Sequence, residues 1–316
     1  MRPGIRMRNT TRDTRVSCFV SRVPCSLAIL AAVLTAAVLS AACSSNNGTE
    51  ASGQVKVTAT LGLFADLVKQ VGGDRVQVST LIPDGSDPHT YEPPPSQIAK
   101  LGQANLVVMN GLHLEAGLEG VIRENASSSA TVLELAAGLA TLEDNPHLWL
   151  DVQNGITYVE RIRDALVSID PAGADVYRAN ADRYLAELRT LDEEVAAAVE
   201  SIPPERRKLV TFHDAYPYLA QGYGLEIVGF VAESPGKEPS AQDVAALTQA
   251  IDDEGVPAVF TEPQFSAGIL DLAADDAGVE VCSLYSDAFT DDVKSYVDLM
   301  RFNARELARC LRGASG

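Results

Sequence analysis

Histidine is the residue of this chain whose type and spacing best suit chemistry. The 316-residue sequence contains only four histidines, and three of them follow apolar, strand-like runs: His89, His147 and His213. The last such run is followed by a carboxylate, Asp287. Ligands of parallel α/β sheets bind beyond the carboxyl ends of the strands. We therefore expect these four side chains to converge on one site.

Three imidazoles and one carboxylate suit a tetrahedral metal site, with bonds of about 2.0–2.2 Å to zinc. Successive members of the set are 58, 66 and 74 residues apart, so they form no short motif such as HExxH or CxxC. Any one of these histidines, taken alone, is more often solvated or hydrogen-bonded than bound to metal. The fourth histidine, His113, is expected on an exposed helix and is left out of the site.

Strands and helices alternate along the chain, and these elements would position the four residues. Apolar patterns predict strands at 55–61, 75–82, 105–110, 131–135, 208–212, 225–230, 257–262 and 279–285. They predict helices at 63–72, 96–104, 112–125, 152–169, 175–201, 215–224, 267–277, from 240 onward and in a closing segment to 310. Ser96 and Ser240 are expected as N-caps. The alternation implies α/β lobes with mostly parallel sheets.

The predicted helix at 175–201 is unusually long and divides the chain. Its apolar side chains recur at three- and four-residue spacing, and charged residues fill the opposite face. At about 1.5 Å per residue it spans roughly 40 Å. We interpret it as a rigid link between two lobes; the alternative is a long surface helix of one domain. The expected division is an N-terminal lobe at 55–171, a linking helix at 172–202 and a C-terminal lobe at 203–316.

Residues 1–43 have the pattern of an export signal. Six arginines accompany an apolar run at 27–39, which is short for a membrane span of about 20 residues. Small residues then precede Cys43, which predicts cleavage and lipid attachment there, although Leu39 lies one position further from Cys43 than usual. The alternative is an ordinary secretory signal. Residues 44–54 are expected to be a flexible tether that leaves the protein lipid-anchored at the outer face of the cytoplasmic membrane.

The exported part of the chain is strongly acidic. Residues 1–43 carry six Arg and one Asp, so their removal changes the formal net charge from −18 to −23. This charge argues against nucleic acid or an anionic membrane face as a partner and fits a cationic ligand. Two cysteines remain, Cys282 and Cys310. In an exported protein they could form a disulfide or stay as two buried thiols, and the sequence leaves both open.

Several long stretches, in matching order from Val55 to Leu311, resemble the zinc- and manganese-binding solute receptors of bacterial ABC importers. They are SDPHTYEPPPSQIAKLGQANLVVMNGLHLE, NPHLWLDVQN, LVTFHDAYPYLAQGYGLEIVG, EPSAQDVAALTQAIDDEGVPAVFTEPQFS and LYSDAF. The resemblance implies two α/β lobes joined by one long rigid helix. It also implies metal-ligand roles for His89, His147, His213 and Asp287. Glu262 of FTEPQFS would be a second carboxylate near the metal or a spare one.

Two departures from that family bear on the metal. Zinc members often carry a His-rich loop in the first lobe, whereas residues 137–145 contain no histidine. Manganese members often have Glu at the position of His213. Imidazoles suit zinc and oxygen donors suit manganese, so zinc is the favoured ligand and manganese the alternative. Three aspartates near the histidines could orient the rings, or could be solvated surface residues: Asp87, Asp151 and Asp214.

The favoured function is capture of a divalent metal and its delivery to an ABC permease, without catalysis. A metallohydrolase is a different class that also uses three histidines and an activated water. Such an enzyme keeps a coordination position open, which Asp287 as fourth ligand would close. A surface adhesin with incidental metal binding is a third class. The resemblance implies a monomer, and the sequence itself carries no signal for oligomerisation.

Overall fold

The structure is a computed structural model that describes residues 53–232, 240–265 and 268–313. The expected export signal, Cys43 and nearly all of the tether lie outside the described residues. No helix in the described part of the chain is long and apolar enough to cross a membrane.

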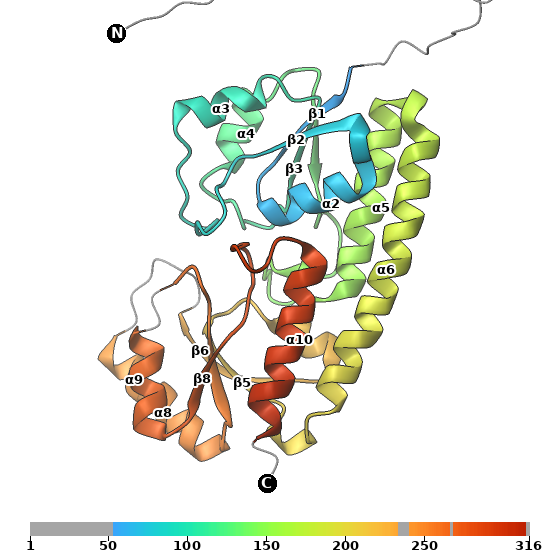
Figure 1. Ribbon diagram of the computed structural model, residues 1–316. Coiled ribbons are helices and arrows are strands. Elements are labelled where there is room, and N and C mark those ends of the chain that lie inside the picture. Colours follow the sequence, from blue (N-terminus) through green and yellow to red (C-terminus); the bar gives the residue numbers. More distant parts are fainter. Residues whose placement is uncertain (1–52, 233–239, 266–267, 314–316) are drawn as a thin grey trace, which may run out of the picture. The chain divides into compact units, whose positions relative to one another are not determined.

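Two four-stranded parallel sheets form the centres of two lobes (Figure 1). The N-terminal sheet has the order β2-β1-β3-β4 and contains β1 (Val55–Ala59), β2 (Val76–Thr80), β3 (Leu106–Met109) and β4 (Thr131–Glu134). The C-terminal sheet has the order β6-β5-β7-β8 and contains β5 (Lys208–His213), β6 (Glu226–Ala232), β7 (Ala258–Thr261) and β8 (Glu280–Ser283). Both lobes therefore repeat one strand order, and the expected α/β class is confirmed.

Nine α-helices connect the strands in the described residues. They are α2 (Gly62–Gly72), α3 (Pro95–Leu101), α4 (Glu119–Asn125), α5 (Val152–Ile169), α6 (Ala174–Glu200), α7 (Pro217–Tyr223), α8 (Ala241–Glu254), α9 (Gly268–Ala277) and α10 (Tyr296–Arg312). Local capping sets several boundaries. Asp151 accepts a hydrogen bond from the backbone N–H of Gln153 at the start of α5, and Ser295 caps α10 in the same way. Gly224 ends α7 in the left-handed conformation, at φ 75°.

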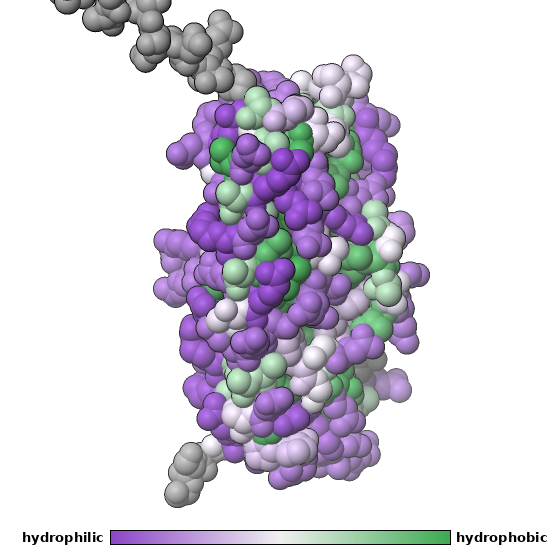
Figure 2. Space-filling model, turned by 90° about the vertical axis from the view of Figure 1, so that its right-hand side faces the viewer, coloured by the Kyte–Doolittle hydropathy of each residue, from purple (hydrophilic) through white to green (hydrophobic). Residues whose placement is uncertain are grey.

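The long helix α6 has 27 residues and runs beside both lobes (Figure 1). Its buried stripe includes Leu185, Leu188 and Leu191, and it packs against α5, α10 and α2. Figure 2 shows the face of the molecule on the side of α5 and α6, where hydrophilic side chains predominate and apolar patches are small. This pattern is what an amphipathic helix with one buried side produces, and the expected long helix is confirmed.

One hydrophobic core extends from the N-terminal sheet through α6 to α10, so the lobes share much of their packing. A smaller core lies between the C-terminal sheet and α8 and α9. The last helix also reaches the N-terminal lobe by polar contacts. The backbone N–H of Tyr296 donates to Asp66 in α2 at 2.9 Å, and the Tyr296 hydroxyl donates to the carbonyl of Trp149 at 2.7 Å.

Two local predictions were wrong. The helix expected at 112–125 begins only at Glu119, and turns with positive φ at Leu112 and His113 precede it. These turns bury Glu115, whose carboxylate accepts the backbone N–H groups of Asn110 and Gly111. A continuous helix would not place that carboxylate against the end of β3. The other error is Ser96, since α3 starts at Pro95 with Pro94 as its N-cap and no side-chain cap.

The two cysteines whose pairing the sequence left open form a disulfide. Cys282 of β8 is bonded to Cys310 of α10 across 28 residues of chain. The bond ties the last strand to the last helix, close to the segment that carries Asp287. Glu280 also lies near the two sulfur atoms, but bonded cysteines offer no thiolate to a metal ion.

Candidate metal centre

The four predicted ligands converge between the two sheets. His89, His147, His213 and Asp287 each offer one donor atom, and these atoms all lie within 4.8 Å of one another. His89 comes from the loop between β2 and α3, and His147 from the segment before α5. His213 is the last residue of β5, and Asp287 follows β8. Each lobe thus contributes two side chains, at or beyond the carboxyl ends of strands.

The distances between donor atoms match a small coordination polyhedron. The Nε2 atoms of His147 and His213 are 3.3 Å apart, and Nε2 of His147 lies 3.4 Å from Oδ1 of Asp287. Oδ2 of Asp287 is 3.8 Å from Nε2 of His213 and 3.9 Å from Nε2 of His89. A tetrahedral zinc site with bonds of about 2.0–2.1 Å has edges of about 3.3 Å. The cluster is therefore close to the size that a metal ion requires.

Three polar atoms of the cluster have no hydrogen-bond partner although they are buried. They are Nε2 of His89 and both carboxylate oxygens of Asp287. Leaving a buried polar atom unpaired costs about 1–3 kcal/mol, so most such atoms in folded proteins have partners. Buried atoms that face one another without hydrogen bonds fit a site in which one cation would bind all of them.

The ring of His213 is held by a buried carboxylate. Its Nδ1 lies 2.5 Å from Oε1 of Glu262, which is only 1% exposed and stands just beyond β7. The other oxygen, Oε2, accepts hydrogen bonds from the Ser286 hydroxyl and, at 3.1 Å, from the amide of Gln264. Glu262 thus orients the ring so that Nε2 faces the other donors. Glu262 therefore lies against the ring of His213 and not among the four converging donor atoms.

The ring of His147 is held by Asn145, which sequence reasoning missed. The side-chain oxygen of Asn145 lies 2.9 Å from Nδ1 of His147 and also accepts the His147 backbone N–H at 3.1 Å. The amide nitrogen of Asn145 donates to the carbonyl of Asp214, next to His213, at 2.6 Å. One side chain therefore connects ligand segments of both lobes. The stretch NPHLWLD contains this residue two positions before the histidine, but only aspartates were predicted as partners of the rings.

The aspartates expected to orient the rings make other contacts. Asp87 accepts the backbone N–H of His89 and the hydroxyl of Thr90, so it shapes the loop rather than the ring. Asp151 caps α5. Asp214 accepts hydrogen bonds from the Asn145 amide nitrogen with its backbone oxygen and, at 3.4 Å, with its carboxylate. Of the two roles that the sequence left open, the first two aspartates do not take the orientation of a ring, because the short Asp side chain serves nearby backbone groups first.

Burial and neighbouring charges shift the pKa values of the four clustered residues in different directions. Burial lowers the pKa of His89 to about 4 and places the pKa of His147 well below its ordinary range, with the charge of His213 adding to both effects. Burial opposes the charged form of His213 too, but the Glu262 carboxylate outweighs it and raises the pKa of His213 to about 9. Burial raises the pKa of Asp287 to about 7. A metal ion would therefore displace protons on binding.

His113 lies apart from the cluster, as expected. Its side chain is 83% exposed, and Nδ1 lies 3.6 Å from Glu119. It stands in a turn rather than in the expected helix.

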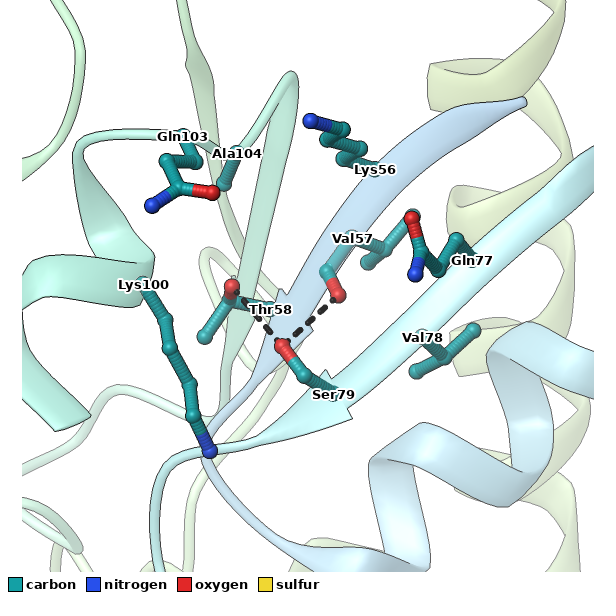
Figure 3. A pocket seen from close by; sticks show the side chains of 9 residues that line it. All are labelled: Lys56, Val57, Thr58, Gln77, Val78, Ser79, Lys100, Gln103 and Ala104. Atoms are coloured by element: carbon teal, nitrogen blue, oxygen red, sulfur yellow. Dashed lines mark hydrogen bonds between the residues drawn. The ribbon is translucent and has the colours of Figure 1, made fainter. Parts of the chain in front are cut away.

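The hollow drawn in Figure 3 also lies outside the candidate centre. Its volume is about 280 Å³, and residues of β1, β2 and the α3 region line it, including Lys56 and Lys100. Two ammonium groups and no histidine or carboxylate make it unsuited to a cation. The four converging ligands therefore remain the candidate metal centre of the described residues.

Two lobes of one strand order, joined by a long helix, enclose an imidazole–carboxylate cluster of the kind that metal-binding proteins use. The sequence matches, over residues 57–310, the family model described as zinc-uptake complex component A, periplasmic. The chain belongs to this family.

The relatives differ in the metals that their names state. The chain is 31% identical over 281 residues to the manganese-binding lipoprotein MntA of Halalkalibacterium halodurans, covering 86% of this chain and 94% of that one. It is 27% identical to the iron ABC transporter substrate-binding lipoprotein MtsA of Streptococcus pyogenes serotype M1, covering 90% and 97%. Among solved structures, the periplasmic zinc-binding protein TroA of Treponema pallidum matches with a TM-score of 0.77 and 29% identity, covering 82% and 99%.

Proposed function

We propose that this chain captures one divalent transition-metal ion outside the cytoplasmic membrane and delivers it to an ABC permease. The ligands would be His89, His147, His213 and Asp287. The observation that supports this most directly is the convergence of four donor atoms from two lobes within 4.8 Å. Beside it, Nε2 of His89 and both oxygens of Asp287 are buried without a hydrogen-bond partner. The family of metal-binding receptors supports the role of carrier.

Zinc is the proposed cargo, and manganese is the alternative. Three imidazoles and one carboxylate favour zinc, because manganese prefers more oxygen donors and lies lower in the general affinity order. Relatives are named for manganese, iron and zinc, so the proposed preference for zinc has to be measured against another metal. In this role the metal is cargo rather than a resident cofactor.

The proposal places the protein at the membrane surface through a lipid on Cys43, as a monomer and without enzymatic activity. The names of the relatives MntA and MtsA include the word lipoprotein, which supports the anchor. A hydrolytic zinc site needs an open position and a nearby general base. Asp287 is buried with both oxygens toward the imidazoles, which supports a ligand role over that of a base.

Competition titration of metal-free protein with zinc and manganese tests the proposal. The wild type should bind one zinc ion and prefer it to manganese, and His213→Glu should shift the preference toward manganese. His113→Ala is the matched control, because it removes an exposed imidazole outside the cluster and should change neither affinity. Absence of stoichiometric binding by the wild type would reject the proposed centre.

The competing hydrolase function is tested with Asp287→Asn. As a ligand, this residue should be needed for tight binding, so the variant should lose metal affinity. A variant that keeps its zinc but loses a measurable hydrolytic turnover of the wild type would favour the enzyme.

A further inference from the structure

Every buried asparagine in the described residues bonds the chain beside a predicted metal ligand. There are three of them: Asn110, Asn145 and Asn303. Asn145 contacts His147 directly, as described above. The other two touch no predicted ligand, yet each is fully buried and each bonds backbone within two residues of one.

Asn110 stands just beyond β3 and secures the segment that leads to His147. Its amide nitrogen donates to the carbonyl of Pro146, the residue before His147, at 2.9 Å. Its side-chain oxygen accepts the hydroxyl of Tyr158 in α5 at 2.6 Å, and its backbone N–H donates to Glu115 at 2.9 Å. Tyr158 and Glu115 thus fix Asn110 in place, while its amide holds the segment before His147.

Asn303 makes the corresponding backbone contact in the C-terminal lobe. It lies in α10, and its side chain pairs with both backbone groups of Tyr285, two residues before Asp287. Its oxygen accepts the Tyr285 N–H at 2.8 Å, and its amide nitrogen donates to the Tyr285 carbonyl at 2.8 Å. This paired contact fixes the position and the direction of the backbone that leaves β8.

We propose that Asn110 and Asn303 are positioning residues that set the backbone of the ligand segments before a metal ion arrives. The inference rests on the proposed function and deepens it. Filling the core alone would not require an amide, since an apolar side chain of similar volume fills the same space without burying polar groups. What an amide adds is a fixed direction for the peptide groups beside His147 and Asp287. Displacing these groups would disturb the arrangement of the donor atoms. In that arrangement Nε2 of His147 and Oδ1 of Asp287 lie 3.4 Å apart.

The test uses Asn110→Leu and Asn303→Leu, which keep the approximate volume and remove the hydrogen bonds. Zinc affinity should fall about tenfold in each, at the lower end of the range for groups that support metal ligands. The absorption spectrum of the Co²⁺-loaded protein, which reports ligand geometry, should change in both. Unfolding of metal-free samples separates a general loss of stability from an effect on the centre.

Thr58→Val is the matched control. The buried Thr58 hydroxyl pairs with the Ser79 hydroxyl of β2 at 3.2 Å, inside the N-terminal sheet rather than with a ligand segment (Figure 3). This variant should lose stability while its zinc affinity and Co²⁺ spectrum stay those of the wild type. If Asn110→Leu does not fold, Tyr158→Phe weakens the same connection more gently, because it removes only the hydroxyl that Asn110 accepts. Its zinc affinity should fall a few-fold.

The outcomes separate the inference from the proposed function. Asparagine variants that lose stability but keep wild-type affinity and spectrum would overturn the positioning role and leave the metal receptor intact. The same result for Tyr158→Phe, where Asn110→Leu does not fold, would overturn the role of Asn110 too. A wild type that binds no metal would instead remove the proposed function, and the inference with it.

Discussion

The third strand of each lobe ends in a buried polar residue, Asn110 after β3 and Glu262 after β7. The two positions correspond in strand order, but they act on different groups. Asn110 bonds the backbone ahead of His147, whereas Glu262 bonds the ring of His213 itself. The neighbouring supports differ too, since a buried carboxylate, Glu115, secures the N-terminal position and the C-terminal lobe has a disulfide.

This difference teaches that one sheet topology can hold the proposed metal ligands by two chemistries. The N-terminal lobe relies on a neutral amide and an ionisable carboxylate that stabilise a turn. The C-terminal lobe relies on a covalent bond and on a charged partner for its imidazole. The two lobes should therefore respond differently to pH and to the loss of single side chains.

The largest expected effect is on the covalent support of the C-terminal lobe. Replacing both Cys282 and Cys310 by Ala should lower the free energy of unfolding by about 3–4 kcal/mol, given the 28-residue separation of the cysteines. Urea unfolding of the metal-free variant and wild type measures this loss. It should be equal at pH 5 and pH 8, because no titrating group is removed. A loss below about 1 kcal/mol would mean that packing alone holds α10.

The ionisable support of the N-terminal lobe should show itself as a pH dependence. Burial raises the pKa of Glu115 from 4.5 to about 7, so the folded protein keeps a proton that the unfolded chain releases in that interval. The stability that Glu115 contributes is therefore greatest below about pH 4.5 and is lost as the pH rises through 7. The difference in unfolding free energy between wild type and Glu115→Gln should fall by about 3 kcal/mol across this window.

Urea unfolding of both metal-free proteins between pH 4.5 and pH 8 measures that difference. Parallel stability curves would show that the carboxylate titrates normally, and the contrast between an ionisable and a covalent support would no longer hold.

The smallest effect compares the partners of the two rings. Glu262→Gln removes the charge that holds His213 and should weaken zinc binding by about 10- to 100-fold, as loss of a ligand's support typically does. Asn145→Ala removes a neutral partner of His147 and should cost less than Glu262→Gln. Competition titration of the two variants gives the order. If Asn145→Ala lost more zinc affinity than Glu262→Gln, the charged partner would not be the stronger of the two supports.

The sequence predicted the fold class because its signals are local. Valine-rich runs mark the strands, and the apolar repeat of α6 needs no tertiary information. The turns around Glu115 were missed for the opposite reason. The segment has a helical pattern, and only the surrounding strand ends make a buried carboxylate there favourable.

The candidate ligands could be proposed from their places after strands, strengthened by the family resemblance. Their supports could not, since Asn145, Ser286 and Asn303 are ordinary polar residues until the fold surrounds them. The pairing of Cys282 with Cys310 likewise depended on how α10 lies against β8. Proximity in space, which spacing along the chain does not encode, determined each of these contacts.

The packing of α10 has a consequence for the order in which the protein can mature. The first residue of this helix lies 230 positions after its partner in α2, the first helix of the described chain, and its flank packs along α6. A chain in which α10 has not yet docked would leave the inner side of α6 bare and the backbone before Asp287 without the amide of Asn303. We therefore expect the proposed metal site to form only after α10 has packed against both lobes.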